Sequence, residues 1–261
     1  MCVRPPSQAD VPKTTHGNRT VFNRVTKLIS ELRALPPLEV NLRCAETAGN
    51  DPFFERIVRK FYRDAMRRHR KFPLVRNYQY GVTACHLTHD FNDYFKSIES
   101  AARRNYKKSL RLGYSFDRID YNNHLDDITA ILRSTRVRQG RPMPAALFTR
   151  ETVASNDPPS TSALHDYPYF GILRDGHLYA FASCLIAGEL CSIETIYGHA
   201  DHQADGIVPM MIIDMAEWVI KHHPDVKYYS YGTYFGATET MQRFKRKFGF
   251  MPHRARWILG D

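Results

Sequence analysis

The sequence lacks any long apolar run, and this absence already limits the kind of protein that it encodes. No stretch reaches the roughly 18 consecutive apolar residues that a membrane-spanning helix needs. The first twenty residues are polar and contain no apolar segment of the kind found in a secretion signal. We therefore expect a soluble protein with no membrane span, in which residues 1–20 form a flexible N-terminus.

Cysteine is also scarce, and its spacing does not suggest pairing. The five cysteines are an odd number, and no two of them form a Cys-x-x-Cys pair. This pattern fits a reducing cytoplasm better than a disulfide framework or a zinc site. His199 and His202 lie three residues apart, but no third ligand follows at a suitable spacing. We therefore expect a cytoplasmic protein without a metal site.

Positive charge, in contrast, is in excess. The chain of 261 residues has a net charge of +10 and a pI near 9.4. The cations cluster in two predicted helices, one containing Arg56, Arg59, Lys60, Arg63, Arg67, Arg68, Arg70 and Lys71, the other Arg103, Arg104, Lys107, Lys108 and Arg111. Each cluster is either a solvated helix face or a surface for a phosphate-rich partner. For the second interpretation the candidate polyanion-binding residues are Arg67, Arg68, Arg103, Arg104, Lys107 and Lys108.

Hydrophobic periodicity predicts mainly helices in the first part of the chain. The expected helices span residues 21–35, 51–70 and 91–112, and the expected short strands span residues 38–45 and 78–87. Asp51 is suited to cap the second helix, with Pro52 in its first turn. We interpret residues 21–113 as a helical N-terminal segment with one or two short strands, packed on the main domain.

The second part, residues 114–261, has a clearer order of elements. A half-buried strand (114–121), a helix (125–138) and an irregular segment (139–167) that is a candidate substrate-side lid come first. Strands at 169–173, 178–186 and 190–197 follow, joined by tight turns at 175–176 and 188–189. A helix (209–222), a strand (227–234) and a short basic helix then complete the domain before a last strand.

This order resembles the GNAT acyltransferase fold, a mixed α/β fold with a mostly antiparallel central sheet and flanking helices. In that superfamily the pattern Arg/Gln-x-x-Gly-x-Gly/Ala opens a helix and holds a pyrophosphate on backbone amides. Gln203 and Gly206 match it, whereas Val208 does not and Pro209 removes a nearby amide. The resemblance implies that Gln203, Gly206, Ile207 and Val208 would face the phosphates of acyl-CoA; the alternative is a plain loop before a helix.

A narrower resemblance is to the Fem-type aminoacyltransferases. It rests on Tyr229, Tyr231, Gly232 and Gly236 followed by Phe244-Lys245-Arg246-Lys247-Phe248, and on Arg104, Lys108 and Gly113 in the helix before the first strand. Fem proteins usually contain two GNAT-like domains, whereas only residues 1–113 precede the matching domain here.

These resemblances imply transfer of an activated acyl or aminoacyl group, from acyl-CoA or aminoacyl-tRNA as co-substrate, to an amine on a small molecule or peptide. They imply no tightly bound cofactor. The alternative is a catalytically silent GNAT-fold protein that binds RNA or another polyanion through its basic helices. A conventional acetyltransferase with an unusual phosphate loop is a third interpretation.

The candidate catalytic residues are Glu194, Tyr229, Tyr231 and Lys245. Glu194 lies midway along its strand and is either a general base or a solvent-facing carboxylate. Tyr229 and Tyr231 share a strand face, where a hydroxyl can donate a proton to a leaving group or simply pack in the core. Lys245, with Gly236 nearby as a donor-binding residue, either stabilises negative charge in the reaction or neutralises a helix C-terminus.

Overall fold

The computed structural model describes residues 30–48, 51–70, 72–138, 141–160 and 162–260. The chain divides into two compact units, Met1–Leu35 and Pro36–Asp261. In the first unit, residues 30–33 are helical, and the amide of Ala34 donates to the carbonyl of Ser30 at 3.0 Å. The flexible N-terminus (1–20) and most of the helix (21–35) that the sequence predicts lie outside the described residues.

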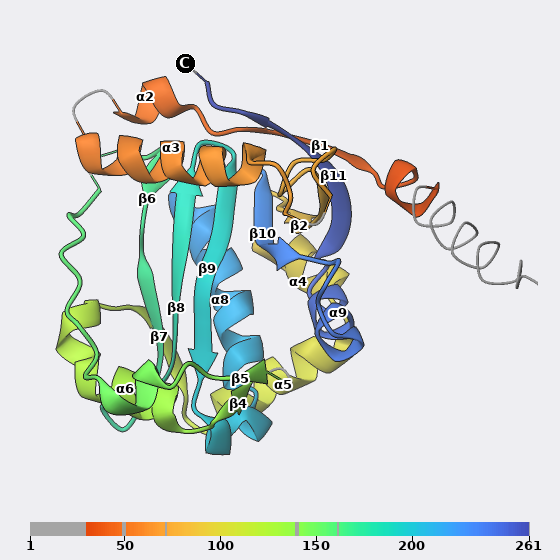
Figure 1. Cartoon of the computed structure of the whole chain (residues 1–261). Helices are drawn as coiled ribbons and strands as arrows, with labels where there is room; N and C mark the ends of the chain where they lie inside the picture. Colours follow the sequence, from red (N-terminus) through yellow and green to blue (C-terminus); the bar gives the residue numbers. More distant parts are fainter. Residues whose placement is uncertain (1–29, 49–50, 71, 139–140, 161, 261) are drawn as a thin grey trace, which may run out of the picture. The chain divides into compact units, whose positions relative to one another are not determined.

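The second unit is built on a nine-stranded sheet (Figure 1). Its strands are β1 (Pro37–Asn41), β2 (Tyr80–His86), β3 (Ser115–Arg118), β6 (His165–Asp166), β7 (Tyr169–Arg174), β8 (His177–Ala187), β9 (Leu190–Gly198), β10 (Tyr228–Thr233) and β11 (Met251–Ile258). The order is β1-β11-β2-β10-β9-β8-β7-β3, with β6 paired to β8. The β1–β11 and β9–β10 pairs are parallel and the others antiparallel, which confirms the predicted mixed, mostly antiparallel sheet.

Helices of different lengths and a small second sheet complete the unit. The helices are α2 (Cys44–Ala48), α3 (Pro52–Met66), α4 (Phe91–Ser97), α5 (Ser100–Arg111), α6 (Leu125–Arg133), α7 (Ala146–Thr149), α8 (Ile207–His222) and α9 (Glu239–Arg246), with 3₁₀ turns η1 (Tyr121–His124) and η2 (Ala200–Asp205). Strands β4 (Val137–Arg138) and β5 (Arg141–Pro142) pair with each other. The predicted irregular segment 139–167 thus holds only short elements in its described part.

The hairpin between β7 and β8 follows directly from the sequence. Asp175 and Gly176 are the two turn residues, and both have positive φ angles, 52° and 81°. A two-residue turn of this hand matches the twist of the two strands, and Asp-Gly tolerates it with little strain. The strands therefore begin and end within a residue or two of the predicted positions.

Strand β2 comes from the first part of the chain but lies inside the sheet. It pairs antiparallel with β10 on one side and with β11 on the other, while β1 adds an outer strand beside β11. Strands from both sides of the boundary that we expect at residue 113 therefore share one sheet within the compact unit Pro36–Asp261. Hydrophobic periodicity finds these strands but not their partners, which lie far away in sequence.

The predicted single helix over residues 91–112 is two helices, α4 and α5. The break falls at Ile98 and Glu99, which adopt extended ψ angles of 156° and 145°. Ile98 is buried in the core, and the amide of Glu99 donates to the carbonyl of Lys247 at 2.9 Å. A tertiary contact therefore interrupts a helical pattern that is continuous in the sequence.

Helices cover the two faces of the sheet unequally. On one face, α4, α5 and α8 bury the alternate residues Ala180, Ala182, Cys184 and Ile186 of β8. On the other face, α3 covers Leu185 and Ala187, and α6 covers Phe181. Figure 1 shows α3 across one end of β8 and β9 and α6 near their other end. The middle of this second face is where a cavity lies.

Candidate functional site

The site forms where two neighbouring parallel strands separate. Strand β10 pairs with β9 over only three residues, Tyr228 to Ser230 opposite Leu190 to Ser192. Beyond this point β9 continues beside β8 to Gly198, while the pairing of β10 with β2 shifts register between Ser230 and Thr233. The two strands therefore leave a gap between their ends, bordered by side chains of both.

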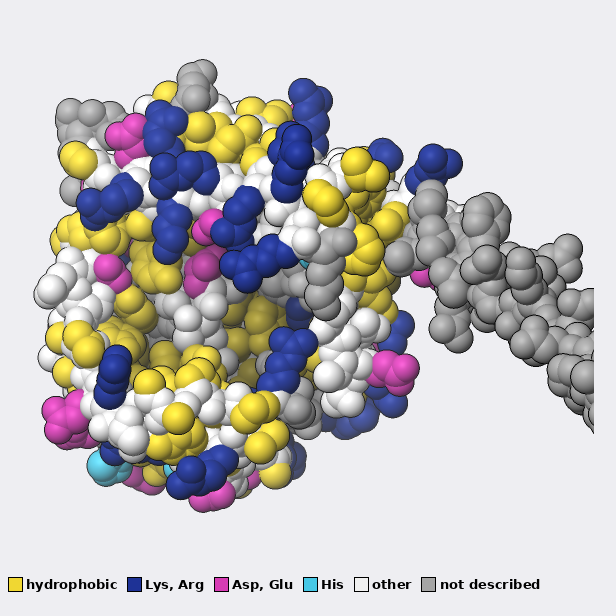
Figure 2. Space-filling model, viewed as in Figure 1, with side chains coloured by type: hydrophobic (Ala, Val, Ile, Leu, Met, Phe, Trp, Pro, Cys, Tyr) yellow, Lys and Arg dark blue, Asp and Glu magenta, His cyan; other side chains and the backbone are white. Residues whose placement is uncertain are grey.

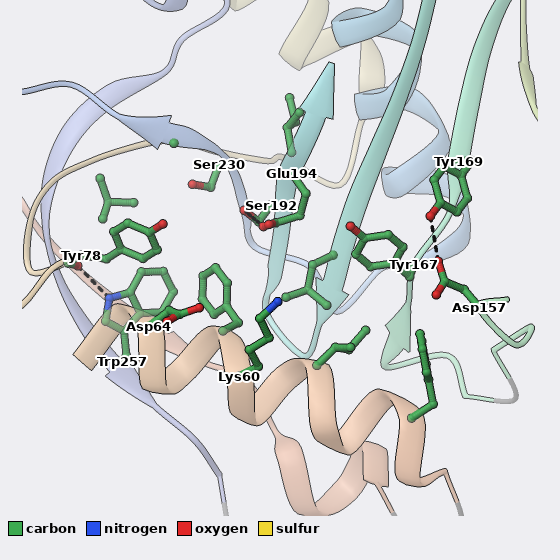
Figure 3. A pocket seen from close by; sticks show the side chains of 17 residues that line it. Lys60, Asp64, Tyr78, Asp157, Tyr167, Tyr169, Ser192, Glu194, Ser230 and Trp257 are labelled. Carbon is green, nitrogen blue, oxygen red and sulfur yellow. Dashed lines mark hydrogen bonds between the residues drawn. The ribbon is translucent and has the colours of Figure 1, made fainter. Parts of the chain in front are cut away.

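A cavity of about 440 Å³ lies on the α3 face of this gap, and we call it the α3-side cavity. Figure 2 shows it as a hollow below the cations of α3, and Figure 3 shows its lining. The lining residues are Phe53, Ile57, Lys60, Phe61, Asp64, Tyr78, Val82, Asp157, Tyr167, Tyr169, Leu185, Ser192, Ile193, Glu194, Ser230, Gly232 and Trp257. Its walls are largely aromatic, and its charged groups are three carboxylates and the ammonium group of Lys60.

Glu194 lies on the strand at the back of this cavity, near its centre (Figure 3). Its carboxylate accepts a hydrogen bond from the hydroxyl of Ser192 at 3.0 Å. The side chain is exposed and open to the cavity, and partial desolvation by the surrounding walls raises its pKa despite the opposing effects of Ser192 and Lys60. A carboxylate with a raised pKa inside a cavity is well suited to take a proton from an incoming group.

A second cavity, of about 400 Å³, lies against α9, and we call it the α9-side cavity. It is lined by Arg141, Tyr231, Thr233, Phe235, Gly236, Ala237, Thr238, Met241 and Lys245. Consecutive residues of β10 alternate between the cavities: Ser230 and Gly232 line the first, Tyr231 and Thr233 the second. The two cavities therefore lie on opposite faces of the same strand end.

Lys245 is held beside this strand end rather than exposed at the end of its helix. Only 5% of its surface is accessible, and its Nζ donates to the carbonyl of Thr233 at 2.8 Å. Nζ also lies 3.4 Å from Oγ1 of Thr83 and 4.9 Å from the centre of the Tyr231 ring. Desolvation lowers its pKa to about 8, so it can both carry a positive charge and release a proton near neutral pH.

Gly232 lies between Lys245 and the α3-side cavity, and it has a backbone but no side chain there. Its φ angle is 58°, in the left-handed region that favours glycine. A Cβ atom at this position would lie 3.7 Å from Nζ of Lys245. The absence of a side chain therefore leaves Lys245 close to the cavity that contains Glu194.

The two candidate tyrosines have different surroundings. Tyr231 borders the α9-side cavity, and its ring packs against Phe250 at 5.9 Å. Tyr229 is fully buried, and its hydroxyl donates to the carbonyl of Ile212 in α8. Tyr229 therefore packs in the core and borders neither of the two cavities described here.

The predicted phosphate loop lies away from both cavities and is covered by α5. Nζ of Lys108 donates to the carbonyl of Ala204 at 2.7 Å, and the Ser109 hydroxyl donates to that of Asp205 at 2.7 Å. A Cβ atom at Gly206 would lie 2.6 Å from the carbonyl oxygen of Asn105. Contacts with α5 thus occupy the loop where the resemblance placed a pyrophosphate. Of the predicted donor-binding residues Gln203, Gly206, Ile207, Val208 and Gly236, only Gly236 borders a cavity described here.

The two basic clusters also differ in their surroundings. Exposed cations line one side of α3 above the cavity: Arg56, Lys60, Arg63 and Arg67, which we call the α3 row (Figure 2). In the α5 cluster, Arg103 donates to three carbonyls of the α4 end and Lys108 is bound to the loop described above. Arg104 and Lys107 remain exposed there, as does Arg68 beyond α3.

Sequence reasoning named Glu194 and Lys245, which line the two cavities, but it named none of the other residues that line the α3-side cavity as a candidate site residue. Asp64 belongs to the polar side of a helix, and Trp257 and Tyr78 come from opposite parts of the chain. They meet because β11 lies beside β2, and the indole of Trp257 donates to the carbonyl of Tyr78 at 2.8 Å. No sequence spacing signals that contact. Asp157 and Tyr167, in contrast, belong to the segment that we expect to form a substrate-side lid.

No helix in the part of the chain that the structure describes is both long and apolar enough to span a membrane. No group of three or more histidine, cysteine, aspartate or glutamate side chains among the described residues is placed to hold a metal ion.

Comparison with known proteins identifies the fold. No protein-family model and no curated protein match the sequence. The solved structure of FemX matches with a TM-score of 0.51 and 10% identity, covering 66% of this chain and 59% of FemX. Two further structures match with lower TM-scores. L-PGS from Bacillus licheniformis has a TM-score of 0.43 and 13% identity, covering 67% of this chain and 61% of L-PGS. A tandem GNAT protein from the clavulanic acid biosynthesis pathway has a TM-score of 0.42 and 14% identity, covering 66% of this chain and 51% of that protein. The chain matches less than two thirds of the length of each.

The fold assignment rests on the FemX match, since the other two TM-scores are below 0.5. The chain has a fold similar to that of FemX, a mixed and mostly antiparallel sheet with flanking helices, as the sequence predicted. At 10% identity this likeness establishes the architecture alone.

Proposed function

We propose that this protein transfers an activated acyl or aminoacyl group to an amine, forming an amide. The observation that carries the proposal is the placement of Glu194 and Lys245 on either side of the β10 end, with cavities on both faces of that strand. Amide formation needs a base for the amine and a positive group for the oxyanion of the tetrahedral intermediate. One group of each kind lines a cavity at this strand end, and this supports the proposal.

In the proposed reaction the acceptor amine enters the α3-side cavity as an ammonium ion. The carboxylate of Glu194 takes its proton, directly or through a water molecule, and the free amine attacks the carbonyl carbon of the donor. A C–N bond forms, and the oxyanion is stabilised by Nζ of Lys245. The bond to the leaving oxygen or sulfur then breaks, and Lys245 or Tyr231 gives the leaving group a proton and regains one from the new amide nitrogen. Glu194 releases its proton to solvent.

The donor is either acyl-CoA or aminoacyl-tRNA, with its acyl arm in the α9-side cavity beside Gly236. Two observations favour the tRNA. Helix α5 occupies the loop that would hold the CoA pyrophosphate, and the α3 row offers a line of exposed cations. A transfer RNA is large enough to contact this row while its acylated end reaches the gap.

The direct experiment measures transfer of radiolabel from acyl-CoA and from a mixed aminoacyl-tRNA pool to a panel of amines. We expect transfer from the tRNA pool and little from acyl-CoA. Transfer from acyl-CoA alone would correct the donor, and no transfer from either would contradict the enzymatic function. Salt-dependent RNA binding without any transfer would instead support the silent, polyanion-binding alternative.

A further inference from the structure

We propose that the acceptor is a dication, with a second positive charge besides its reactive amine, and that the α3-side cavity binds this second charge at Asp157. The inference rests on the proposed function only for the identity of the reactive group. It concerns the chemical class of the acceptor. Examples are a diamine and a basic amino acid, in which the side chain and the free amine carry the two positive charges.

The charge of the cavity is opposite to that of the whole chain. The cavity is lined by the carboxylates of Asp64, Asp157 and Glu194. Lys60 is the cation among the described residues that line it. When all four side chains are ionised, the three carboxylates and one ammonium group give the lining a net charge of −2, whereas the whole chain has a net charge of +10. In the described residues Lys60 forms no ion pair with any of the three carboxylates. The cavity therefore holds negative charge that its own cations leave uncompensated.

The three carboxylates are arranged along the cavity with Glu194 in the middle. Figure 3 shows Asp64 and Tyr78 on one side of Glu194, and Tyr167, Tyr169 and Asp157 on the other. A ligand whose reactive amine is at Glu194 therefore extends towards one of two further carboxylates. This geometry favours a ligand with two charged ends over one with a single ammonium group.

Asp157 is the better prepared of the two end carboxylates. Its Oδ2 accepts hydrogen bonds from the hydroxyls of Tyr169, at 2.7 Å, and Ser155, at 2.6 Å. These bonds orient the carboxylate, and no cation of the described residues pairs with it. Asp64, in contrast, already has Arg67 at 4.0 Å on the same helix. An oriented, unpaired carboxylate is a good receptor for an alkylammonium group.

The walls between the carboxylates are also suited to a cationic chain. Tyr78, Tyr167 and Tyr169 present aromatic rings beside the carboxylates, and Phe61 and Trp257 complete the wall. Aromatic faces attract ammonium groups, and their apolar surface packs against a methylene chain. Of the α3 row, Lys60 lines the cavity, whereas Arg56, Arg63 and Arg67 are exposed to solvent, where salt screens charges over about 8 Å at physiological ionic strength.

The experiment compares three ligands with the same five-carbon chain by isothermal titration calorimetry on the full chain. They are 1,5-diaminopentane, pentylamine and 5-aminopentanoate, which carry two positive charges, one positive charge, and one of each sign. We expect the diamine to bind about tenfold more tightly than pentylamine, equivalent to about 1.4 kcal/mol, and the amino acid to bind most weakly. Replacing Asp157→Asn should remove the advantage of the diamine.

The matched control is Asp175→Asn, an exposed carboxylate in the β7–β8 turn, where asparagine tolerates the positive φ angle. It should leave all three affinities unchanged. Equal affinities for the diamine and pentylamine, tighter binding of the amino acid, or no binding of the diamine would each overturn the inference. The transfer assay separates it from the proposed function: selective binding without transfer contradicts the function alone, and equal transfer to both amines contradicts the inference alone.

Discussion

Desolvation shifts the pKa values of Glu194, which is exposed to the cavity, and of the buried Lys245 towards each other. Desolvation disfavours the charged form of each group, so the pKa of the carboxyl rises and that of the ammonium group falls to about 8. Both groups therefore exchange protons closer to neutral pH than they would in water. Amide formation needs one group that accepts a proton and one that donates a proton, and Glu194 and Lys245 are suited to these two tasks at one strand end.

Replacing Glu194→Gln tests the proposed base. The amide keeps the shape of the side chain but cannot accept the proton, so we expect kcat to fall about 10²- to 10⁴-fold. The free energy of unfolding should stay the same or increase, because a partly desolvated charge is removed. Steady-state transfer kinetics and urea unfolding measure the two effects, with Glu151→Gln on an exposed loop as the matched control.

The outcome that would contradict a role for Glu194 is a variant with wild-type kcat. In the wild-type enzyme, activity should fall on acidification as Glu194 becomes protonated, at a pH above the usual carboxyl pKa of 4.5. The Glu194→Gln variant should lose this acidic limb of the pH profile.

The lowered pKa of Lys245 predicts that the free energy of unfolding depends on pH. Its pKa is about 8 in the folded state and 10.5 in the unfolded chain, so between these values the unfolded state binds more protons. Stability from this group therefore rises with pH over that interval, and the rise between pH 7.5 and 9.5 is about 2 kcal/mol. Urea unfolding at pH 7.5 and 9.5 should show the rise in the wild type relative to Lys245→Met. Parallel changes in the two proteins would contradict the lowered pKa.

At the scale of elements, the end of β10 is held in place by β2. The buried hydroxyl of Thr83 in β2 donates to the carbonyl of Tyr231, lies 3.1 Å from that of Gly232 and 3.4 Å from Nζ of Lys245. These contacts occur where β10 leaves β9 and its register with β2 shifts. A strand from the first part of the chain thus positions the groups that border both cavities.

Replacing Thr83→Val removes this hydroxyl while keeping the shape of the side chain. We expect a loss of about 1–3 kcal/mol in the free energy of unfolding, because a buried carbonyl loses its donor. The activity should fall more than stability alone explains, since Lys245 loses a neighbour that fixes its position. Urea unfolding and transfer kinetics check this, with Ser115→Ala on the edge strand β3 as the control. Unchanged stability would contradict the role of Thr83.

At the scale of the whole molecule, the asymmetric distribution of positive charge distinguishes the two donors. The α3 row is exposed, whereas Arg103 and Lys108 of α5 are bound to neighbouring backbone. If aminoacyl-tRNA is the donor, binding should weaken with salt in proportion to the phosphates contacted.

Replacing Arg56, Arg63 and Arg67 with Gln should raise the KM for aminoacyl-tRNA and flatten its dependence on salt concentration. The matched control replaces the exposed Arg104 and Lys107 of α5 with Gln and should change neither quantity. A larger effect from the α5 variant would move the polyanion site to that helix. No effect from either would leave acyl-CoA as the donor to be tested.

The sequence by itself determined the local elements and therefore the fold class. Alternating and 3.6-residue patterns, together with the Asp175-Gly176 turn, depend on interactions between near neighbours, which a sequence displays directly. The meander β7–β9, helix α8 and strand β10 were predictable for this reason, and the resemblance in residues 228–250 led to Lys245. Glu194 was found because it is a carboxylate on the strand next to β10.

Only the tertiary structure decided which groups face one another. The insertion of β2 between β10 and β11, the break at Ile98 and Glu99, and the burial of Tyr229 all depend on partners distant in sequence. The same is true of the α3-side cavity, where Asp64, Tyr78, Asp157 and Trp257 meet from four separate segments. The physical reason is that desolvation and contact, which give these side chains their chemistry, are properties of the packed chain and leave no period or spacing in the sequence.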